Sequence, residues 1–175
     1  IGANAFSFLK SVVSIVVPDS VRRIEDGAFS YCTNLEVLRL PEQVEFCEDH
    51  FIMGCESLRS VHIPKGLGSL SGMFSIGGCS SLREIVLPEG LRTISTGGLG
   101  AICRCDALER IVLPSSVTRI GPGGAFRENK NLKMFEVHPD NLAFRAADGV
   151  LFSKDMTRLV RCPEAKMGVY KIPDT

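Results

Sequence analysis

The stretch CTNLEVLRLPEQV, residues 32 to 44, decides the fold because the chain repeats it. CESLRSVHIPKGL follows at 55 to 67, CSSLREIVLPEGL at 79 to 91 and CDALERIVLPSSV at 105 to 117. In each copy a leucine is followed three and five residues later by further aliphatic residues, and a proline then ends the apolar run. Such self-similarity at a fixed period is typical of a repeat architecture, in which every copy builds the same structural unit.

Six copies of this L-x-x-L-x-L pattern follow one another along the chain. Their first apolar positions, 23 to 26 residues apart, are Val12, Leu35, Leu58, Leu82, Leu108 and Leu132. About seven apolar side chains per copy contribute roughly 10 to 20 kcal/mol on burial, whereas ordering ~23 residues of backbone costs on the order of 23 to 46 kcal/mol. One copy alone is therefore unstable, and we expect the copies to stack as a solenoid.

The spacing is that of a leucine-rich repeat, a β-rich repeat of the α/β type. We expect a curved leucine-rich-repeat solenoid whose L-x-x-L-x-L segments form a parallel β-sheet on one face. Short strands and 3₁₀ or helical turns are expected on the other face. Residues 1–139 supply six repeats, and residues 140–175 add a hairpin-like excursion, a capping strand and, in YKIP, the start of a further repeat within the same domain.

Longer stretches of the chain carry a resemblance to a known family. VPDSVRRIEDGAFSYCTNLEVLRLP at 17–41 and LPSSVTRIGPGGAFRENKNLKMFEV at 113–137 resemble the bacterial BspA-like leucine-rich repeat. DGVLFSKDMTRLVRCPEAKMGVYKIPDT at 148–175 is similar to a segment common between repeats in that family. The resemblance implies a protein that is exported or attached to the surface of a host-associated bacterium, with a role in adhesion and protein binding.

The middle of the chain departs from this pattern. SLSGMFSIGGC at 69–79 and TISTGGLGAIC at 93–103 are longer and rich in glycine, which permits φ > 0 and backbone bulging. We expect distorted coils around 68–104. The apolar residues there either fill widened coils or line a pocket for a small hydrophobic ligand. The candidate pocket residues are Met73, Phe74, Ile76, Leu99 and Ile102.

Four of the seven cysteines stand three residues before the strand leucine of their copy, namely Cys32, Cys55, Cys79 and Cys105. Leu9 and Asn129 take this place in the outer copies. One sulfur per coil lacks the paired C-x-x-C spacing of a zinc site, so we expect buried, reduced thiols and no metal. Cys47 occupies a core position, and we expect Cys162 to be the exposed thiol.

The sequence offers no arrangement typical of catalysis. Ser60 and His62 share a face of one strand, but no acidic residue at the matching position would orient the imidazole, so a surface histidine is expected. The glycine-rich segments lack the signatures of phosphate-binding loops. We therefore expect no enzyme, no catalytic residues and no cofactor.

The outward positions of the L-x-x-L-x-L segments form the remaining candidate site. Neighbouring parallel strands lie ~4.8 Å apart, so we expect the pairs Glu36–Arg59, Arg83–Glu109 and Glu109–Lys133. The face is either a solvated surface or a mixed-charge surface for a protein partner. The candidate binding residues are Glu36, Arg39, Arg59, His62, Arg83, Glu84, Val86, Glu109, Arg110, Val112, Lys133 and Met134.

Composition and charge exclude several other classes. The formal net charge is +0, with no basic patch for nucleic acid, and no apolar run approaches the ~20 residues that span a membrane. The chain begins at Ile1, and we expect a fragment or a processed form. The leading hypothesis is an exported module that binds a host or bacterial surface protein. The alternatives are a binder of a small hydrophobic ligand and a structural spacer in a larger surface protein.

Overall fold

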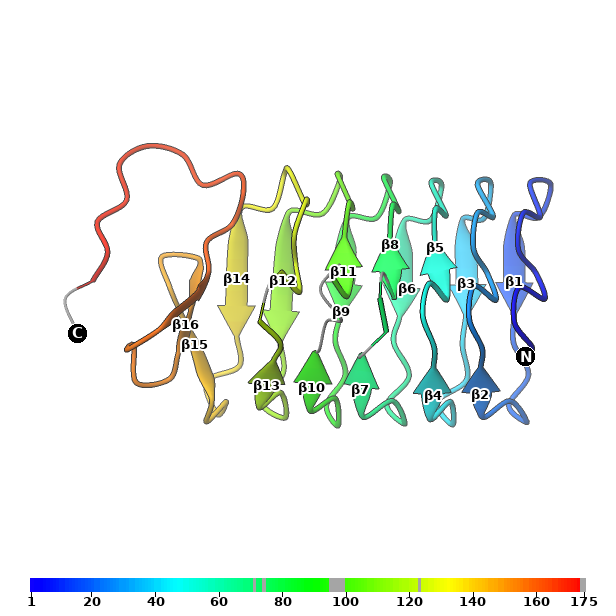
Figure 1. Ribbon diagram of the computed structural model, residues 1–175, viewed down its shortest axis with the longest axis horizontal. Coiled ribbons are helices and arrows are strands. Elements are labelled where there is room, and N and C mark those ends of the chain that lie inside the picture. The colour runs from blue at the N-terminus through cyan, green and yellow to red at the C-terminus, as the bar shows by residue number, and fades with distance from the viewer. Residues whose placement is uncertain (71, 74, 95–99, 123, 174–175) are drawn as a thin grey trace.

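The computed structural model describes residues 1–173 except 71, 74, 95–99 and 123. The six L-x-x-L-x-L segments form one parallel sheet, which confirms the predicted leucine-rich-repeat solenoid (Figure 1). In spatial order the strands are β1 (Ser14–Val16), β3 (Val37–Arg39), β6 (Ser60–His62), β9 (Glu84–Val86), β12 (Arg110–Leu113) and β14 (Met134–Val137).

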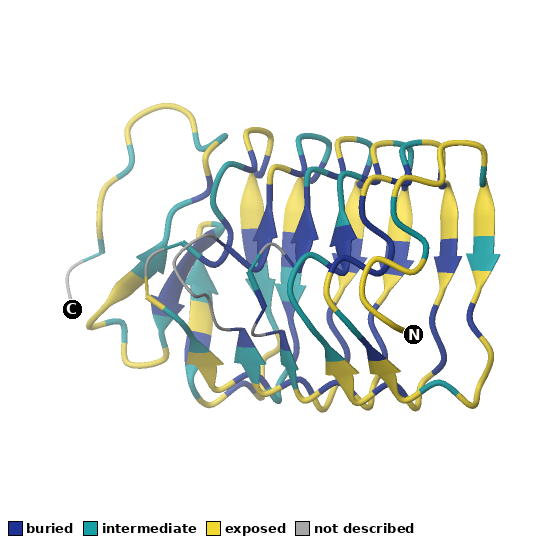
Figure 2. Ribbon diagram, turned by 45° about the vertical axis from the view of Figure 1, so that its right-hand side comes forward, coloured by how far each residue is buried: buried dark blue, intermediate teal, exposed yellow. Residues whose placement is uncertain are grey.

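The six strands are aligned so that equivalent residues of successive copies lie side by side. Leu38 pairs with Val61, Val61 with Ile85 and Ile85 with Ile111. These inward side chains are at most 4% exposed. Because successive side chains of a strand point to opposite faces, the residues between them face solvent, and the strands in Figure 2 alternate between buried and exposed accordingly.

A turn at the proline that follows each of the first five sheet strands reverses the chain. The carbonyl of Pro41 accepts a hydrogen bond from the N–H of Val44 at 3.3 Å, and Pro64 and Leu67 form the same turn at 3.1 Å. Proline has no N–H and a fixed φ, so it cannot extend the ladder of hydrogen bonds. The next strands of each coil therefore run back in the opposite direction (Figure 1).

Two further walls of short parallel strands complete the coils. One contains β2 (Arg23–Ile24) paired with β4 (Phe46–Cys47), and β7 (Ser69–Leu70), β10 (Thr93–Ile94) and β13 (Arg119–Ile120) as a three-stranded sheet. The other contains β5 (Ile52–Met53), β8 (Ile76–Gly77) and β11 (Ile102–Cys103). The expected 3₁₀ or helical turns do not occur in the described residues. The backbone groups bond to the next coil instead of to their own turn, as the N–H of Gly54 does to the carbonyl of Gly77 at 2.7 Å.

The corner before the cysteine position uses a left-handed backbone conformation. Tyr31 has φ of 59°, Gly54 of 70° and Gly78 of 65°. A Cβ on Gly54 would lie 2.6 Å from Cδ1 of Tyr31, so glycine lets the tyrosine ring lie against the next coil. The other side of that ring stacks on Phe8, with ring centroids 5.0 Å apart. Glycine at 54 thus serves both the corner and the packing of an aromatic ring.

The four aligned cysteines lie inside this corner and are 0% exposed, in agreement with the sequence analysis. Cys32 Sγ donates to the carbonyl of Phe6 at 3.0 Å, and Cys55 Sγ donates to that of Phe29 at 3.1 Å. Burial raises the pKa of Cys55 to about 12. Cys162, which we expected to be exposed, is partly buried because the chain packs back on the last coil next to it.

An antiparallel sheet lies beyond the last solenoid strand, at the left of Figure 1. It comprises β15 (Phe144–Ala147), β16 (Val150–Ser153) and β17 (Leu159–Arg161). Phe144 and Leu151 join the solenoid core at 3% and 0% exposure. A buried side chain, Asn141, precedes this sheet: its Nδ2 donates to the carbonyls of Pro114 and Val117, at 2.7 and 3.0 Å.

The expected strand at residues 170–173 is not found, and these residues have no regular secondary structure. A further repeat strand would have to bond to the outer edge of β14. That edge is occupied, because the N–H of Phe135 donates to the carbonyl of Gly149 at 2.8 Å.

Candidate functional site

The outward side of the six-stranded sheet, called the sheet face below, gathers the residues selected from the sequence. Of the twelve selected residues, all are exposed except Val112, which is half-buried. They lie on the strands of this sheet or immediately before them, so their spacing is fixed by the backbone ladder. The two halves of the face differ in whether their charged side chains form ion pairs with one another.

The half formed by β9, β12 and β14 carries its own ion pairs. Arg110 lies between two carboxylates, with Nη2 3.0 Å from Glu84 Oε1 and Nη1 3.4 Å from Glu136 Oε1. Lys133 Nζ lies 2.8 Å from Glu109 Oε2, which confirms one expected pair. The hydrogen bond from Lys133 holds the pKa of Glu109 below its ordinary value. The charges on this half are therefore largely matched within the molecule.

The half formed by β1, β3 and β6 is different. The expected Glu36–Arg59 pair does not form, and neither Arg39 nor Arg59 takes part in an ion pair within the described part of the chain. An exposed pair gains little in water, so two long side chains are not held together by charge alone. The expected ion pair of Arg83 with Glu109 is not formed among the described residues, although the charge of Arg83 helps to lower the pKa of Glu109.

His62 has an acidic partner that we did not expect. Its Nε2 lies 2.8 Å from Oε1 of Glu42, a residue in the turn after β3, and Glu42 Oε2 accepts the N–H of Lys65 at 2.8 Å. The bond from Lys65 and then that from His62 lower the pKa of Glu42. No hydrogen bond joins Ser60 to His62 in the described residues, and the bond from the His62 ring goes to Glu42.

A sequence signal for this partner exists in the proline turns. The dipeptide Pro-Glu occurs at 41–42 and again at 88–89, in turns that stack on the next coil. Glu89 accepts the backbone N–H of Ser115 at 2.9 Å, as Glu42 does from Lys65. A glutamate in this place bridges one turn to the next; the second oxygen of Glu42 meets His62 on the following strand, whereas that of Glu89 accepts bonds from Ser115 and Ser116 in the next turn.

Apolar side chains stand among the charges of the sheet face. Val16 is 69% exposed, Val86 55%, and Val37 and Met134 42% each. Val16 and Val37 were not selected from the sequence, although their outward positions in the strands predicted that both side chains would be exposed. The face therefore offers both apolar contact area and charged hydrogen-bond donors.

The apolar pocket expected in the glycine-rich middle is not supported. Ile76 and Ile102 are both 0% exposed, because they pair in β8 and β11 and point into the core. Met73 is half-buried, and Phe74 and Leu99 lie outside the described residues. The prediction was wrong for the two isoleucines, because the strands that contain them, β8 and β11, continue the third wall of the solenoid.

Two hollows stand out on the surface. A shallow one of about 530 Å³ lies on the sheet face and is lined by Arg83, Glu84, Ala107, Glu109, Arg110 and Asn131. Another lies between the last coil and the antiparallel sheet, away from the sheet face. In the described part of the chain, no cluster of three or more His, Cys, Asp or Glu side chains could hold a metal ion.

The stacked coils, the continuous parallel sheet and its outward face define a leucine-rich-repeat module. Residues 1–133 match the family model described as a BspA type leucine rich repeat region, in six copies. The chain belongs to this family.

Solved structures of bacterial proteins are similar to the chain. The pneumococcal vaccine antigen PcpA is 27% identical, with a TM-score of 0.76 over 92% of this chain and 39% of that one. A leucine rich cell surface protein from Faecalibacterium prausnitzii is 29% identical, with a TM-score of 0.67 over 99% of this chain and 46% of that one. The leucine rich repeat protein of T. pallidum is 28% identical, with a TM-score of 0.67 over 81% and 62% of the two chains.

The chain spans less than half the length of the first two of these structures. A comparison with curated proteins found no match. No helix among the described residues is long and apolar enough to cross a membrane.

Proposed function

We propose that this chain is a protein-binding module of an exported, surface-exposed bacterial protein, and that it engages its partner through the sheet face. Family membership supports export, as do two structural neighbours, of which one is titled a cell surface protein and the other a vaccine antigen. The partner is a protein of the host or of a bacterial surface.

The half of the sheet face on β1, β3 and β6 is the observation that carries the proposal. Arg39 and Arg59 are exposed there without an ion pair in the described residues, next to the exposed side chains of Val16 and Val37. Arginine presents a planar fork of donors that suits carboxylates, and it is enriched in protein interfaces. The rigid ladder beneath these side chains limits the entropy lost on binding. The partner surface that fits is acidic, with apolar side chains beside its carboxylates.

Capture of host extracellular proteins tests the proposal. The bait is the whole chain, compared with the double variant Arg39→Glu/Arg59→Glu and with the control Arg22→Glu/Arg119→Glu, which changes two exposed arginines outside the six-stranded sheet. We expect the wild type and the control to capture the same protein and the sheet-face variant to lose it. Equal capture by both variants would contradict the sheet face as the site.

One other function remains a measurable outcome of the same experiment. Failure of every form to capture a protein would favour a structural spacer within a larger surface protein. Binding of a small hydrophobic ligand by the middle coils has lost its support, because Ile76 and Ile102 are fully buried in the core.

A further inference from the structure

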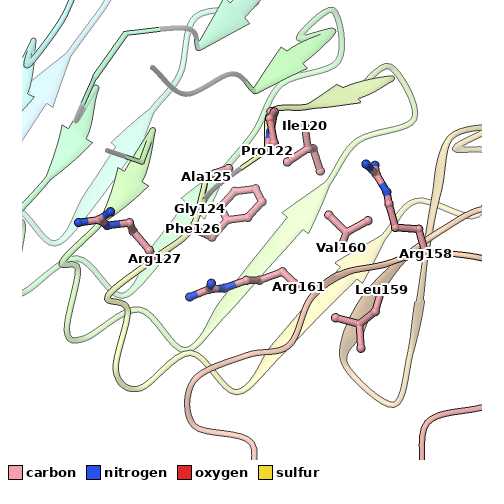
Figure 3. Close-up of a pocket in the computed structure, with 11 residues that line it drawn as sticks. Ile120, Pro122, Gly124, Ala125, Phe126, Arg127, Arg158, Leu159, Val160 and Arg161 are labelled. Atoms are coloured by element: carbon pink, nitrogen blue, oxygen red, sulfur yellow. The ribbon is translucent and has the colours of Figure 1, made fainter. Parts of the chain in front are cut away.

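A hollow of about 390 Å³ lies at the junction between the last coil and the antiparallel sheet (Figure 3). One wall is the end of β13 and the turn after it, and the other wall is β17. No residue of the six-stranded sheet takes part. This junction hollow is lined by Ile120, Gly121, Pro122, Gly124, Ala125, Phe126, Arg127, Arg158, Leu159, Val160 and Arg161.

The charged residues of the junction hollow are all cationic. Arg127 Nη2 lies 2.8 Å from Glu128 Oε1, and Arg161 Nη2 lies 2.5 Å from Glu164 Oε1, both carboxylates outside the lining. Arg158 is exposed, and its guanidinium forms no ion pair within the residues that the structure describes. The hollow therefore carries a positive charge that the protein does not neutralise.

Arg161 differs from Arg158, because its guanidinium is paired with Glu164. Its Nε is buried and has no acceptor among the described residues. Glu164 Oε1 accepts hydrogen bonds both from Arg161 Nη2, at 2.5 Å, and from the N–H of Glu128, at 2.7 Å. Buried donors in native proteins are nearly always paired, and a guanidinium is best satisfied by two parallel bonds to one carboxylate. This Nε is buried away from solvent, so the exposed guanidinium of Arg158 is the donor of the hollow that remains for a ligand oxygen.

The rest of the lining is apolar. Ile120 and Val160 come from opposite walls, and Leu159 is 41% exposed beside them. Figure 3 shows the guanidinium groups of Arg158 and Arg161 pointing in different directions on either side of these apolar side chains. The volume lies within the range of roughly 300 to 1,000 Å³ that small-ligand sites occupy.

We infer that the junction hollow binds a carboxylate carried next to an apolar side chain, as a short acidic peptide segment presents it. A bare anion would leave the apolar wall uncovered, and a purely apolar ligand would remove water from the arginines without replacing its hydrogen bonds. The carboxylate bonds to Arg158, and the neighbouring side chain packs on Ile120 and Val160. This site is separate from the sheet face and does not depend on the function proposed for it.

Titration by ¹H–¹⁵N nuclear magnetic resonance of the whole chain tests the inference. The probes are acetyl-Gly-Leu with a free carboxylate, acetyl-Gly-Leu-amide, acetyl-Leu-Glu-amide and inorganic sulfate. We expect saturable shifts of the Gly121, Gly124 and Val160 amides with the free acid and none with acetyl-Gly-Leu-amide. Shifts with acetyl-Leu-Glu-amide would identify a glutamate side chain as a carboxylate source, whereas their absence would assign the site to a peptide C-terminus.

The Arg158→Gln variant provides the energetic test, because the side chain is exposed and has no role in an ion pair within the described residues. Loss of a charge-assisted hydrogen bond weakens binding of the free acid by about tenfold or more. Arg22→Gln is the matched control and should bind as the wild type does. Unchanged binding by Arg158→Gln would overturn the inference, as would equal shifts with sulfate or shifts confined to other surfaces.

Discussion

In the middle coils and at the C-terminal junction, different side chains form the hydrogen bonds to buried backbone groups. In the middle coils a thiol lies inside the corner and donates one bond, as Cys55 does to Phe29 at 3.1 Å. At the junction, buried amides take this role: Asn129 bonds the N–H of Cys105 and two carbonyls, and Asn141 forms four backbone bonds. A regular coil satisfies its backbone through its neighbours, so a small weak donor suffices. Where the repeat gives way to another sheet, an amide with two donors and an acceptor replaces those missing bonds.

Replacing Asn141 tests this difference most severely. Its Oδ1 accepts the N–H groups of Ala143 and Phe144, at 2.9 and 2.8 Å, and its Nδ2 serves two carbonyls of the last coil. Asn141→Ala leaves these buried groups without partners, and we expect a loss of about 3 to 5 kcal/mol in the free energy of unfolding. Urea unfolding measures it, with Asn34→Ala as the control for an exposed amide that makes one backbone bond. A loss below about 1 kcal/mol, similar to one ordinary hydrogen bond, would show that the amide does not hold the junction.

The second substitution compares an amide with a thiol at one position, residue 129. Asn129 is 0% exposed and stands where the four middle copies have cysteine. We expect Asn129→Ala to cost about 2 to 3 kcal/mol, because the N–H of Cys105 and two carbonyls lose their partner. Asn129→Cys should recover part of this loss if a thiol at this position can donate a hydrogen bond to a backbone carbonyl of the corner. Equal stability of the two variants, measured by urea unfolding, would show that the sulfur contributes nothing there.

The solenoid was predictable because each position of L-x-x-L-x-L fixes the direction of its side chain. Leu38, Val61 and Ile85 therefore point inward and Arg39 outward, as expected from the alternation of a strand. The two-residue strands of the other walls were harder to predict. Such strands form because neighbouring coils are aligned. In a stretch such as Ile76–Gly77, no local sequence pattern distinguishes a short strand from a bulge.

The polar contacts between coils were the least predictable part. The His62–Glu42 contact depends on which turn stacks beside which strand, and this follows only from the assembled coils. Asn141 gave no signal because it stands just outside the six repeats. The junction hollow combines β13 with β17, whose residues are far apart in the sequence and share no motif.

The reactivity of the thiols tests how well the coils bury them, and it can be measured on the unmodified protein. Burial raises the pKa values of Cys47, Cys55 and Cys103 to about 12 each. Because the thiolate is the reacting form, we expect these thiols to react at pH 8 on the order of a hundredfold more slowly in the native chain than after unfolding. A disulfide-exchange reagent should find few fast thiols in the native protein and all seven cysteines in urea. The Cys162→Ser variant identifies the contribution of the half-buried thiol near the junction. Rapid native reaction of several thiols would contradict the burial of these side chains.

The smallest expected effect concerns the carboxylates that join successive turns of the middle coils. Bonds from Lys65 and then His62 lower the pKa of Glu42, and bonds that begin with the Ser115 N–H lower that of Glu89. The unfolded chain therefore binds protons on these groups at a higher pH than the native chain. Their stabilisation is fully present above the unfolded pKa, near 4.5, and is lost as the pH falls through the lower native values.

Glu42→Gln/Glu89→Gln should accordingly lower stability at pH 7 and lose less of it between pH 5 and pH 3 than the wild type does. The control is Glu45→Gln, which changes an exposed carboxylate with no side-chain hydrogen bond in the described residues. Because both bridging groups are close to water, the change is small and weakens further with salt. Urea unfolding at several pH values measures it. Identical acid slopes in all three proteins would show that the stacked turns are held by their backbone bonds alone, and that the glutamates only occupy the space between them.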